Sequence, residues 1–301
     1  MAQTKHEIQQ ILSAASTSPR HRFGQNFMID QNLVRLVADA GMLTRDDVVI
    51  EVGPGTGTLT EELLSRAARV IAVEIDRDLA RALRERFATE ERFMLIEGDA
   101  LSSKHEINVA LRDQLAGVRS TAGSTERFAT KLVANLPYNI ASPLVIELLI
   151  ERVDLLVFTV QKEVADRLRA KENDEAYGPL SVMAAMLSRV EVLRTLPPQA
   201  FWPAPKIDSA LVRMTRDDQL AEHAREFSRF VQKLFSFRRK TMRKALAQIG
   251  LDVERVLNEL SIDPRSRPET ISPEQLFQLF KSSVGDAPRT STSLGAGKRG
   301  G

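Results

Sequence analysis

The sequence contains no cysteine, which excludes disulfide bonds and zinc sites built from thiolates. Its histidines, His6, His21, His105 and His223, are too scattered to form a metal-ligand motif. No apolar run approaches the roughly twenty residues that a membrane-spanning helix needs, and the N-terminus is too polar for a signal peptide. We therefore expect a cytoplasmic protein with no metal site and no membrane contact.

An excess of charge of one sign is also missing from the chain as a whole, because 42 basic residues nearly balance 40 acidic ones. The balance is uneven along the sequence. Residues 213–244 hold ten Lys or Arg against four Asp or Glu. A basic stretch of this kind is either a solvated helical surface or a binding surface for a polyanion such as a nucleic acid. Composition alone leaves both interpretations open.

The 301 residues, 43% of them hydrophobic, are enough to bury one large core or two modest ones. Short β-branched runs alternate with longer helical patterns, which predicts a mostly parallel sheet with helices on both faces. Later runs at 190–193 and 210–213 predict that the sheet finishes with an antiparallel pair. The predicted parallel strands are 48–52, 70–74, 93–96, 132–134 and 155–160.

The end of the chain differs from the rest, because only helical spacing of apolar residues is found from Glu222 onward, with Gly250 as a helix stop. Both termini are polar and have little to bury, which predicts mobile tails. Residues 113–130 contain two glycines and several hydroxyl side chains, and we expect a surface loop there. The expected divisions are an N-terminal tail at 1–19, a sheet domain at 20–215, a helical domain at 216–285 and a disordered tail at 286–301.

A glycine-rich turn, Gly53-Pro54-Gly55-Thr56-Gly57, follows the first predicted strand and precedes a helical pattern. Glycine there lets the backbone approach a ligand where a β-carbon would clash. Two acids stand at the ends of the next two strands, where Glu74 suits the hydroxyls of a ribose and Asp99 suits the amino group of an adenine. Asp99 has a second interpretation, as the N-cap of the following turn.

Glu51, directly before this turn, distinguishes between cofactors. Its carboxylate would repel the pyrophosphate of a dinucleotide, but it suits the amino group and the sulfonium of S-adenosylmethionine. The three strand ends therefore favour an S-adenosylmethionine pocket, and NAD is the alternative on these residues alone.

The stretch Asn135-Leu136-Pro137-Tyr138, after the fourth predicted strand, combines an acceptor, a rigid turn and an aromatic ring. The amine of adenine is a poor nucleophile because its lone pair is delocalised into the ring. The Asn135 oxygen and the Leu136 carbonyl, exposed by Pro137, suit its two hydrogens, and Tyr138 suits stacking against the base. On this hypothesis positioning supplies the rate, and no strong base is needed. The alternative is an ordinary turn with Tyr138 half-buried.

Together these motifs resemble the bacterial small-subunit (16S) ribosomal RNA adenine dimethyltransferase family over about residues 20–280. The resemblance implies an α/β fold, a Rossmann-like class I S-adenosylmethionine-dependent methyltransferase sheet with a small all-helical C-terminal domain. The chain departs from the family pattern at His21, at Met28 and in the longer region 113–130. Other segments that carry the resemblance are 22–28, 161–164, 176–182, 201–210 and 238–243.

The resemblance implies dimethylation of the exocyclic amines of two adjacent adenosines in a hairpin loop near the 3′ end of 16S rRNA, within the 30S particle, as part of small-subunit biogenesis. Tyr138 and Phe201 would hold the adenine between them, and we expect Phe201 in an exposed, proline-flanked segment. The implied RNA contacts are Arg238, Arg239, Lys240 and Arg243. The implied contacts with S-adenosylmethionine are Asn26, Met28, Gly53, Glu74, Asp99 and Asn135.

Two other functions are kept open. A dimethyltransferase acting on one adenine of large-subunit RNA shares the fold and the base motif, although segments 200–210 and 238–243 favour the small subunit. An RNA-binding ribosome-assembly factor with dispensable catalysis is the other, although the intact glycine turn and base motif speak against complete loss of catalysis. In each case we expect a monomer whose partner is ribosomal RNA.

Overall fold

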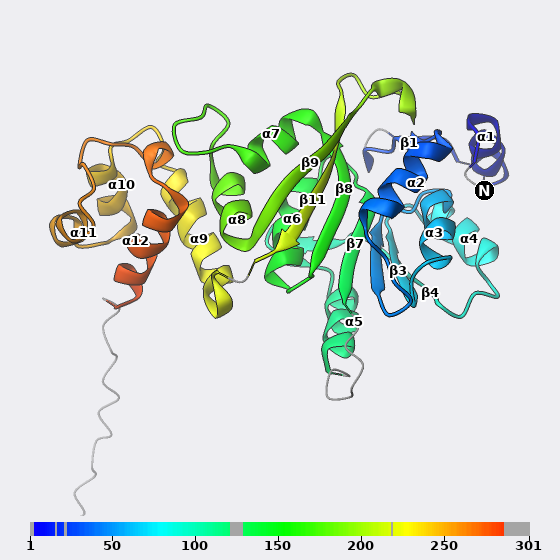
Figure 1. Ribbon diagram of the computed structural model, residues 1–301, viewed down its shortest axis with the longest axis horizontal. Coiled ribbons are helices and arrows are strands. Elements are labelled where there is room, and N and C mark those ends of the chain that lie inside the picture. The colour runs from blue at the N-terminus through cyan, green and yellow to red at the C-terminus, as the bar shows by residue number, and fades with distance from the viewer. Residues whose placement is uncertain (1–2, 16, 21–22, 121–128, 218, 286–301) are drawn as a thin grey trace, which may run out of the picture. The chain divides into compact units, whose positions relative to one another are not determined.

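The computed structural model of the chain describes residues 3–15, 17–20, 23–120, 129–217 and 219–285. They divide into two compact units, one that ends at Arg225 and one that begins at Glu226 (Figure 1). The sequence-based expectations for His21 and Arg22, for residues 121–128 and for the tail at 286–301 lie outside the described residues.

The first unit is built on a seven-stranded sheet with the order β4-β3-β2-β7-β8-β11-β9. The first five strands in this order pair in parallel, as predicted. They are followed by β11 (Ser209–Arg216), which lies antiparallel to both β8 and β9 (Ser188–Leu196) and confirms the predicted antiparallel end. The parallel strands are β2 (Val48–Val52), β3 (Arg69–Glu74), β4 (Phe93–Glu97), β7 (Thr130–Asn135) and β8 (Leu155–Gln161).

The strand order reverses between β2 and β7, because the chain builds β2, β3 and β4 outward and then returns to place β7 against the other side of β2. In open α/β sheets the loops on the two sides of such a point diverge, and they leave a crevice outside the carboxyl ends of the strands. The glycine turn follows β2, and the Asn135 motif ends β7. Both predicted sites therefore lie at this crevice.

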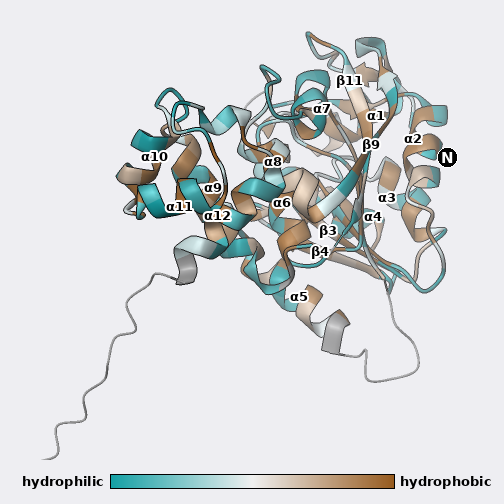
Figure 2. Ribbon diagram, turned by 60° about the vertical axis from the view of Figure 1, so that its left-hand side comes forward, coloured by the Kyte–Doolittle hydropathy of each residue, from teal (hydrophilic) through white to brown (hydrophobic). Residues whose placement is uncertain are grey.

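Helices cover both faces of the sheet (Figures 1 and 2). On one face, α2 (Gln31–Ala40) buries Leu33, Val34 and Val37 in one core cluster with residues of α3 (Thr58–Leu64) and of the central strands. Each such side chain contributes about 1.5–3 kcal/mol when it is fully buried. The neighbouring helix α4 (Arg77–Arg86) packs against β3 and β4.

The opposite face carries α6 (Ala141–Ile150) and α8 (Pro179–Leu187), with α7 (Lys162–Arg169) beside them. Seven of the ten residues of α6 and seven of the nine residues of α8 are buried, which explains why their sequences show little amphipathic alternation. Between these two helical layers lie the central strands, where every residue of β2 and six of the seven residues of β8 are buried.

The N-terminus differs from the expected mobile tail at 1–19, because Lys5–Ala14 forms helix α1. A capping box between Thr4 and Glu7 begins the helix. Ile8 and Leu12, four residues apart, are 0% and 2% exposed and pack with Phe27. The prediction is wrong for this helix because two apolar residues in an otherwise polar stretch are enough to pack it against Phe27 and Leu79.

The expected loop at 113–130 is also wrong in its first half, where α5 (Val109–Ser120) continues the chain as a helix. Leu111 and Leu115 are 0% and 1% exposed and fix one side of this helix. Gly117 suggested a loop, but it lies within α5. A β-carbon added there would meet nothing within 4 Å, so no close packing requires glycine at this position. The remaining short elements of the first unit are β1 (Phe27–Met28), β5 (Leu101–Ser103), β6 (Glu106–Ile107), β10 (Phe201–Trp202) and the 3₁₀ turns η3 (Pro198–Ala200) and η4 (Ala221–His223).

The second unit consists of helices alone over its described residues, as predicted for the end of the chain. Gly250 ends α10 with a left-handed φ of 88°, which confirms its expected role as a helix stop. Phe227 and Phe235 are buried, and Phe227 contacts the rings of Phe277 and Phe280. The elements are α9 (Ala224–Phe235), α10 (Met242–Ile249), α11 (Val253–Glu259), η5 (Pro268–Thr270) and α12 (Pro273–Gly285). Within the described ranges of both units, no helix has the length and apolarity needed to cross a membrane.

Candidate functional site

A hollow opens at the crevice in the first unit and encloses about 990 Å³, including space open to solvent. Separate segments meet in its wall: Phe23–Met28 near the N-terminus, Glu51–Thr56 from the last residues of β2 onward, the ends of β3 and β4, and Asn135–Ile140 from the last residue of β7 onward.

The glycine turn shapes one side of this hollow. Gly53 and Gly55 adopt left-handed φ angles of 73° and 60°, which residues with a β-carbon rarely take. A β-carbon on Gly55 would lie 2.8 Å from the Cε1 atom of Phe27, and one on Gly53 would lie 3.2 Å from the Cγ atom of Pro137. The turn is therefore in direct contact with both the N-terminal motif and the base motif.

Glu74 ends β3 inside the hollow and is only 3% exposed. The Gly55 N–H donates to its Oε2 atom over 3.1 Å, and the Asp76 N–H donates to its Oε1 atom over 2.9 Å. These donors fix the carboxyl group and leave each oxygen a second lone pair for a ligand hydroxyl. Burial raises the pKa of Glu74 to about 7, against the lowering effect of the two N–H donors.

Glu51 is the second buried acid, 2% exposed and also in the wall of the hollow. Thr60 donates a hydrogen bond of 2.6 Å from its hydroxyl to the Oε2 atom of Glu51. Burial raises the pKa of Glu51 to about 8; the Thr60 hydrogen bond lowers it, and the charge of Glu74 raises it again. A cationic ligand beside these two acids would favour their ionised forms.

The raised pKa of Glu51 predicts that a cationic cofactor binds more tightly as the pH rises. Below a pKa of about 8 the carboxyl group holds a proton in the empty protein, and this proton must leave before the cation gains its partner. We expect the affinity for S-adenosylmethionine to rise by up to about tenfold per pH unit between roughly pH 6 and 8, and then to level off. Titration calorimetry in buffers of different ionisation enthalpy measures both the affinity and the released proton.

The matched variant for this pH test is Glu51→Gln, which keeps an acceptor for Thr60 and cannot ionise. In this variant the cofactor affinity should no longer change with pH near 8, whereas the change near pH 7 that is due to Glu74 should remain. The stability of the empty protein should show the opposite trend, because a raised acid pKa stabilises the folded state at low pH and loses this contribution as the pH rises toward 8. If the affinity of Glu51→Gln depends on pH as the parent's does, then ionisation of Glu51 does not contribute to cofactor binding.

Asp99 has two proposed roles, of which the structure shows the turn cap. Its Oδ1 atom accepts the Leu101 N–H over 3.0 Å, which confirms the interpretation as the cap of a turn. Its backbone carbonyl accepts a 2.9 Å hydrogen bond from Asn108 Nδ2, which braces the β5–β6 hairpin. Asp99 nevertheless lies in the wall of the hollow. Its contact with an adenine amino group stays a prediction.

The N-terminal motif closes the hollow from the other side. Asn26 and the buried Met28 both lie in its wall. Asn135 Nδ2 donates a 2.6 Å hydrogen bond to the Asn26 carbonyl, which joins two positions 109 residues apart. All the residues predicted to contact the cofactor therefore line one hollow: Asn26, Met28, Gly53, Glu74, Asp99 and Asn135.

The first turn of the chain also reaches the glycine turn, which sequence reasoning missed. Gln3 Nε2 donates to the Thr56 carbonyl over 3.3 Å, and the Thr58 hydroxyl donates to Gln3 Oε1 over 2.8 Å. Gln3 is 7% exposed, and only the capping signature Thr4-x-x-Glu7 could have indicated an ordered helix beside it.

In the base motif, Asn135 is held at both ends of its side chain. Thr159 donates from its hydroxyl to Asn135 Oδ1, and the amide nitrogen is bound to the Asn26 carbonyl. Thr159 lies opposite Asn135 in the β7–β8 register and is fully buried. Sequence reasoning missed Thr159, although a lone hydroxyl within the apolar run Leu155–Val160 was the available signal. The free lone pair of Asn135 Oδ1 is thus given a fixed direction.

The rest of the motif suits a planar base. Within the described residues, the Leu136 carbonyl has no hydrogen-bond partner, and Pro137 adds no N–H of its own. Tyr138 lies in the wall of the hollow and is half-buried, with its hydroxyl 2.7 Å from Ser209 Oγ. Burial raises the pKa of Tyr138, while the contact with Ser209 lowers it. The phenol is therefore neutral, and its hydroxyl is held by Ser209.

Phe201 differs from its expected exposed position. It is 2% exposed and packs in the core with Met28, Leu196 and Leu211. The reason is the two-residue pairing of β10 with β1, in which Phe201 lies opposite Met28. The expectation of exposure is wrong, and a role in holding a base stays a prediction that requires the ring to leave this core position.

The four predicted RNA contacts lie together in the second unit, at the turn between α9 and α10, and all are exposed. Arg243 forms a 2.5 Å ion pair with Glu254, and Lys240 Nζ lies 5.8 Å from the centre of the Phe237 ring. For Arg238 and Arg239, the described part of the chain supplies no ion-pair partner. These two side chains are the ones most available to a phosphate.

Comparison with known proteins agrees with this geometry. A family profile described as "Ribosomal RNA adenine dimethylase" matches residues 16–284 of the chain. A curated relative, "Ribosomal RNA small subunit methyltransferase A" of Hahella chejuensis, is 42% identical over 265 residues, which are 86% of this chain and 91% of that protein.

Solved structures show the same fold. A dimethyladenosine transferase from Plasmodium falciparum aligns with a TM-score of 0.64 at 22% identity, covering 83% of this chain and 94% of that one. A 23S rRNA methyltransferase aligns with a TM-score of 0.56 at 25% identity, covering 85% of this chain and 99% of that one. The likeness at 22% identity concerns the fold alone.

Proposed function

Because this chain belongs to the ribosomal RNA adenine dimethylase family, whose members are S-adenosylmethionine-dependent RNA methyltransferases, we propose that it dimethylates two adjacent adenosines of small-subunit RNA. The proposed target is a hairpin loop near the 3′ end of 16S rRNA within the 30S particle. The observation that carries the proposal is the single hollow that contains both the glycine turn with its acids and the Asn135 motif.

The residues present fit S-adenosylmethionine. Glu74 keeps lone pairs for the ribose hydroxyls, Asp99 lies at the next strand end for the adenine, and Glu51 offers a negative charge to the cationic end. A β-carbon at Gly53 or Gly55 would narrow the turn that cradles the ligand. When bound, the cofactor supplies a methyl group attached to a positively charged sulfur.

For the target base, Asn135 Oδ1 and the Leu136 carbonyl would accept the two amine hydrogens and direct the nitrogen lone pair into the hollow. Tyr138 would stack against the ring, and Thr159 keeps the Asn135 oxygen in place. Each transfer would form one N–C bond as the bond between the methyl carbon and the cofactor's sulfur breaks, the sulfur keeping the electron pair as a neutral thioether, and a proton of the amine then leaves to solvent. After the first transfer one hydrogen is left, and one of the two acceptors still holds it, which permits the second transfer.

Small-subunit specificity is supported by the 42% identity to a small-subunit enzyme, against 25% to the 23S enzyme of known structure. The exposed arginines of the second unit supply a surface for the RNA backbone. We further propose that the protein acts as a monomer in the cytoplasm, where ribosomal particles are found.

The test is mass spectrometry of RNA after incubation of unmethylated 30S particles with labelled S-adenosylmethionine. We expect dimethyladenosine at two adjacent positions near the 3′ end of 16S rRNA. Its absence there would overturn the proposal. Dimethyladenosine in 50S particles would support the large-subunit alternative, and tight binding to 30S particles without methylation would support an assembly factor.

The double variant Arg238→Ala with Arg239→Ala is expected to bind 30S particles about tenfold more weakly and with a flatter dependence on salt. Each arginine that neutralises a phosphate releases counterions, so the slope of log affinity against log salt should fall by roughly 1 to 2. Filter binding at several salt concentrations measures this slope.

A matched control, Arg229→Ala with Lys281→Ala, removes the same charge from exposed positions of α9 and α12. The control should leave the slope within error of the parent's. Equal slopes in all three proteins would return residues 238–243 to the interpretation of a solvated surface.

A further inference from the structure

Asp76 is a buried acid that the proposed chemistry does not use. It follows Glu74 by two residues, is 1% exposed, and caps the N-terminus of α4 by accepting the Asp78 N–H over 3.1 Å. A helix cap explains one hydrogen bond to one of its oxygens. It does not explain the two side chains that reach Asp76 from the N-terminal part of the chain.

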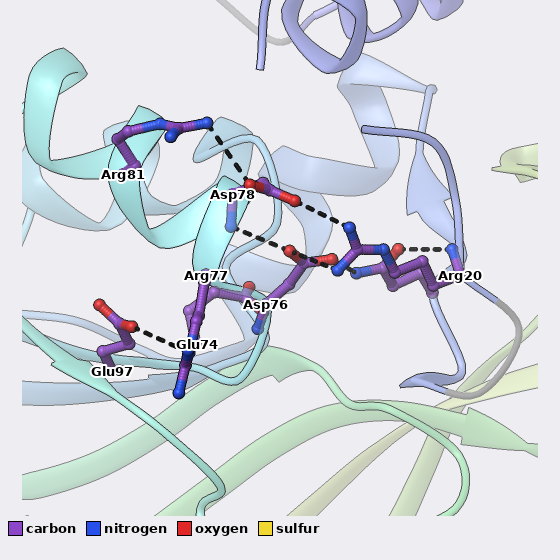
Figure 3. A network of polar contacts seen from close by, with 8 residues as sticks. Arg20, Glu74, Asp76, Arg77, Asp78, Arg81 and Glu97 are labelled. Atoms are coloured by element: carbon purple, nitrogen blue, oxygen red, sulfur yellow. Dashed lines mark hydrogen bonds and ion pairs between the residues drawn. The ribbon is translucent and has the colours of Figure 1, made fainter. Parts of the chain in front are cut away.

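Figure 3 shows Arg20 pointing toward the start of α4. Its Nη1 atom lies 3.2 Å from Asp76 Oδ1, and its Nη2 atom lies 2.8 Å from Asp78 Oδ2. Gln25 Nε2 donates to Asp76 Oδ2 over 3.3 Å, and Gln25 Oε1 accepts the Arg20 N–H over 2.8 Å. Both oxygens of Asp76 are thus bound to a segment more than fifty residues away.

This junction differs from an ordinary surface ion pair. The Asp76 side chain is 0% exposed and that of Arg20 is 32% exposed, so solvent screens the charge on Asp76 weakly. A buried carboxylate that loses its partners is costly, which favours the arrangement in which Arg20 and Gln25 stay in contact with it.

The junction is also continuous with the cofactor hollow. Gln25 and its neighbours Gly24 and Asn26 lie in the wall, and the Asp76 N–H donates to Glu74 Oε1. Asp76 therefore connects three parts at once: the start of α4, the carboxyl group of Glu74 and the N-terminal motif. Movement at Asp76 would reach two sides of the same hollow.

We propose that Asp76, through Arg20 and Gln25, is a positioning residue that holds the N-terminal motif at residues 23–28 against the cofactor pocket. It acts through other groups and touches neither the cofactor nor the RNA. The inference rests on the proposed assignment of the hollow to S-adenosylmethionine.

The first test is the dissociation constant of S-adenosylhomocysteine, measured by calorimetry on the full chain. Asp76→Ser keeps a good helix cap and is too short to hold Arg20 and Gln25, so it separates the two roles of Asp76. Arg20→Met removes the cation from the other side. Both variants should raise the dissociation constant about tenfold while the melting temperature of Asp76→Ser stays near the parent's.

Conservative and control variants sharpen the result. Arg20→Lys can restore one of the two ion pairs and should bind with an intermediate affinity. Arg81→Ala removes another cation of the same network, which contacts Asp78 over 3.4 Å and does not reach the N-terminal motif. It should leave the dissociation constant within roughly twofold of the parent's.

Hydrogen–deuterium exchange supplies a readout that a helix cap alone would not move. Amides of residues 23–28 should exchange faster in Asp76→Ser than in the parent, and those of α4 should not. Faster exchange confined to α4 would show that the variant has only weakened the helix.

A dissociation constant near the parent's in both Asp76→Ser and Arg20→Met would overturn the inference, whatever their melting temperatures. If Asp76→Ser does not fold, the Arg20 variants decide the question. Glu74→Ala separates failure of this inference from failure of the proposed function. If Glu74→Ala binds S-adenosylhomocysteine as the parent does, the assignment of the hollow to the cofactor is wrong. If Glu74→Ala loses binding while Asp76→Ser and Arg20→Met keep it, only the inference about Asp76 fails.

Discussion

Asn135→Ala is expected to transfer methyl groups to 30S RNA about 10²–10³-fold more slowly than the parent, because it removes a fixed acceptor from the reacting amine. The loss should fall mainly on kcat, since stacking on Tyr138 and the RNA surface of the second unit are left intact. The same change removes the hydrogen bond to the Asn26 carbonyl, so the cofactor should also bind more weakly. Single-turnover methylation with saturating cofactor separates the two effects.

Thr159→Val is the matched control for this variant. Valine has nearly the shape of threonine and removes only the hydroxyl that holds Asn135 Oδ1. We expect about a tenfold loss of rate, because the acceptor is kept but is no longer fixed in direction. A rate for Asn135→Ala close to the parent's would show that the motif is an ordinary strand-to-loop turn.

The strands and the sites at their ends followed from the sequence because both depend on local patterns. Apolar runs such as Val48–Val52 form buried parallel strands, and the residues that follow them meet at one edge of the sheet. The sequence alone therefore places the glycine turn, Glu74, Asp99 and the Asn135 motif at one site, and the structure shows them in the wall of one hollow.

Phe201 was misplaced for a physical reason. Its neighbourhood is rich in proline, which suggested an exposed rigid segment, yet Phe201 pairs with Met28 across a sheet of only two residues per strand. A pair of strands this short leaves no alternation of apolar and polar residues to detect. The contact depends on where the whole N-terminal motif lies, which is a property of the tertiary fold.

The polar supports of the site were missed for a related reason. Thr159 and Asp76 act on residues 24 and more than 50 positions away, and each alone has an ordinary explanation as a strand residue or a helix cap. Only the register of β8 against β7 and the course of the N-terminal motif show what they hold. Sequence spacing locates groups at strand ends, and it does not show which long-range partners fix them.

Glu74→Ala is expected to weaken binding of S-adenosylmethionine about 100-fold while binding to 30S particles changes little. The variant loses an acceptor for the ribose hydroxyls, and hydrogen bonds to a charged group contribute about 1.5–3 kcal/mol each. It also leaves the Gly55 and Asp76 N–H groups without their acceptor, which loosens the glycine turn. Calorimetry with S-adenosylhomocysteine measures the cofactor term, and filter binding measures the RNA term.

Glu74→Gln and pH together identify the cause of this loss. With a pKa of about 7, Glu74 is mostly neutral well below that pH and ionised above it. Glutamine keeps one acceptor and cannot ionise, so its deficit in affinity relative to the parent should be small near pH 6 and should widen through about pH 8. A deficit that stays constant with pH would mean that shape, and not charge, accounts for the role of Glu74. Parent-like affinity in Glu74→Ala would place the ribose elsewhere, because no other carboxyl group in the wall of the hollow is held by the N–H of the glycine turn itself among the described residues.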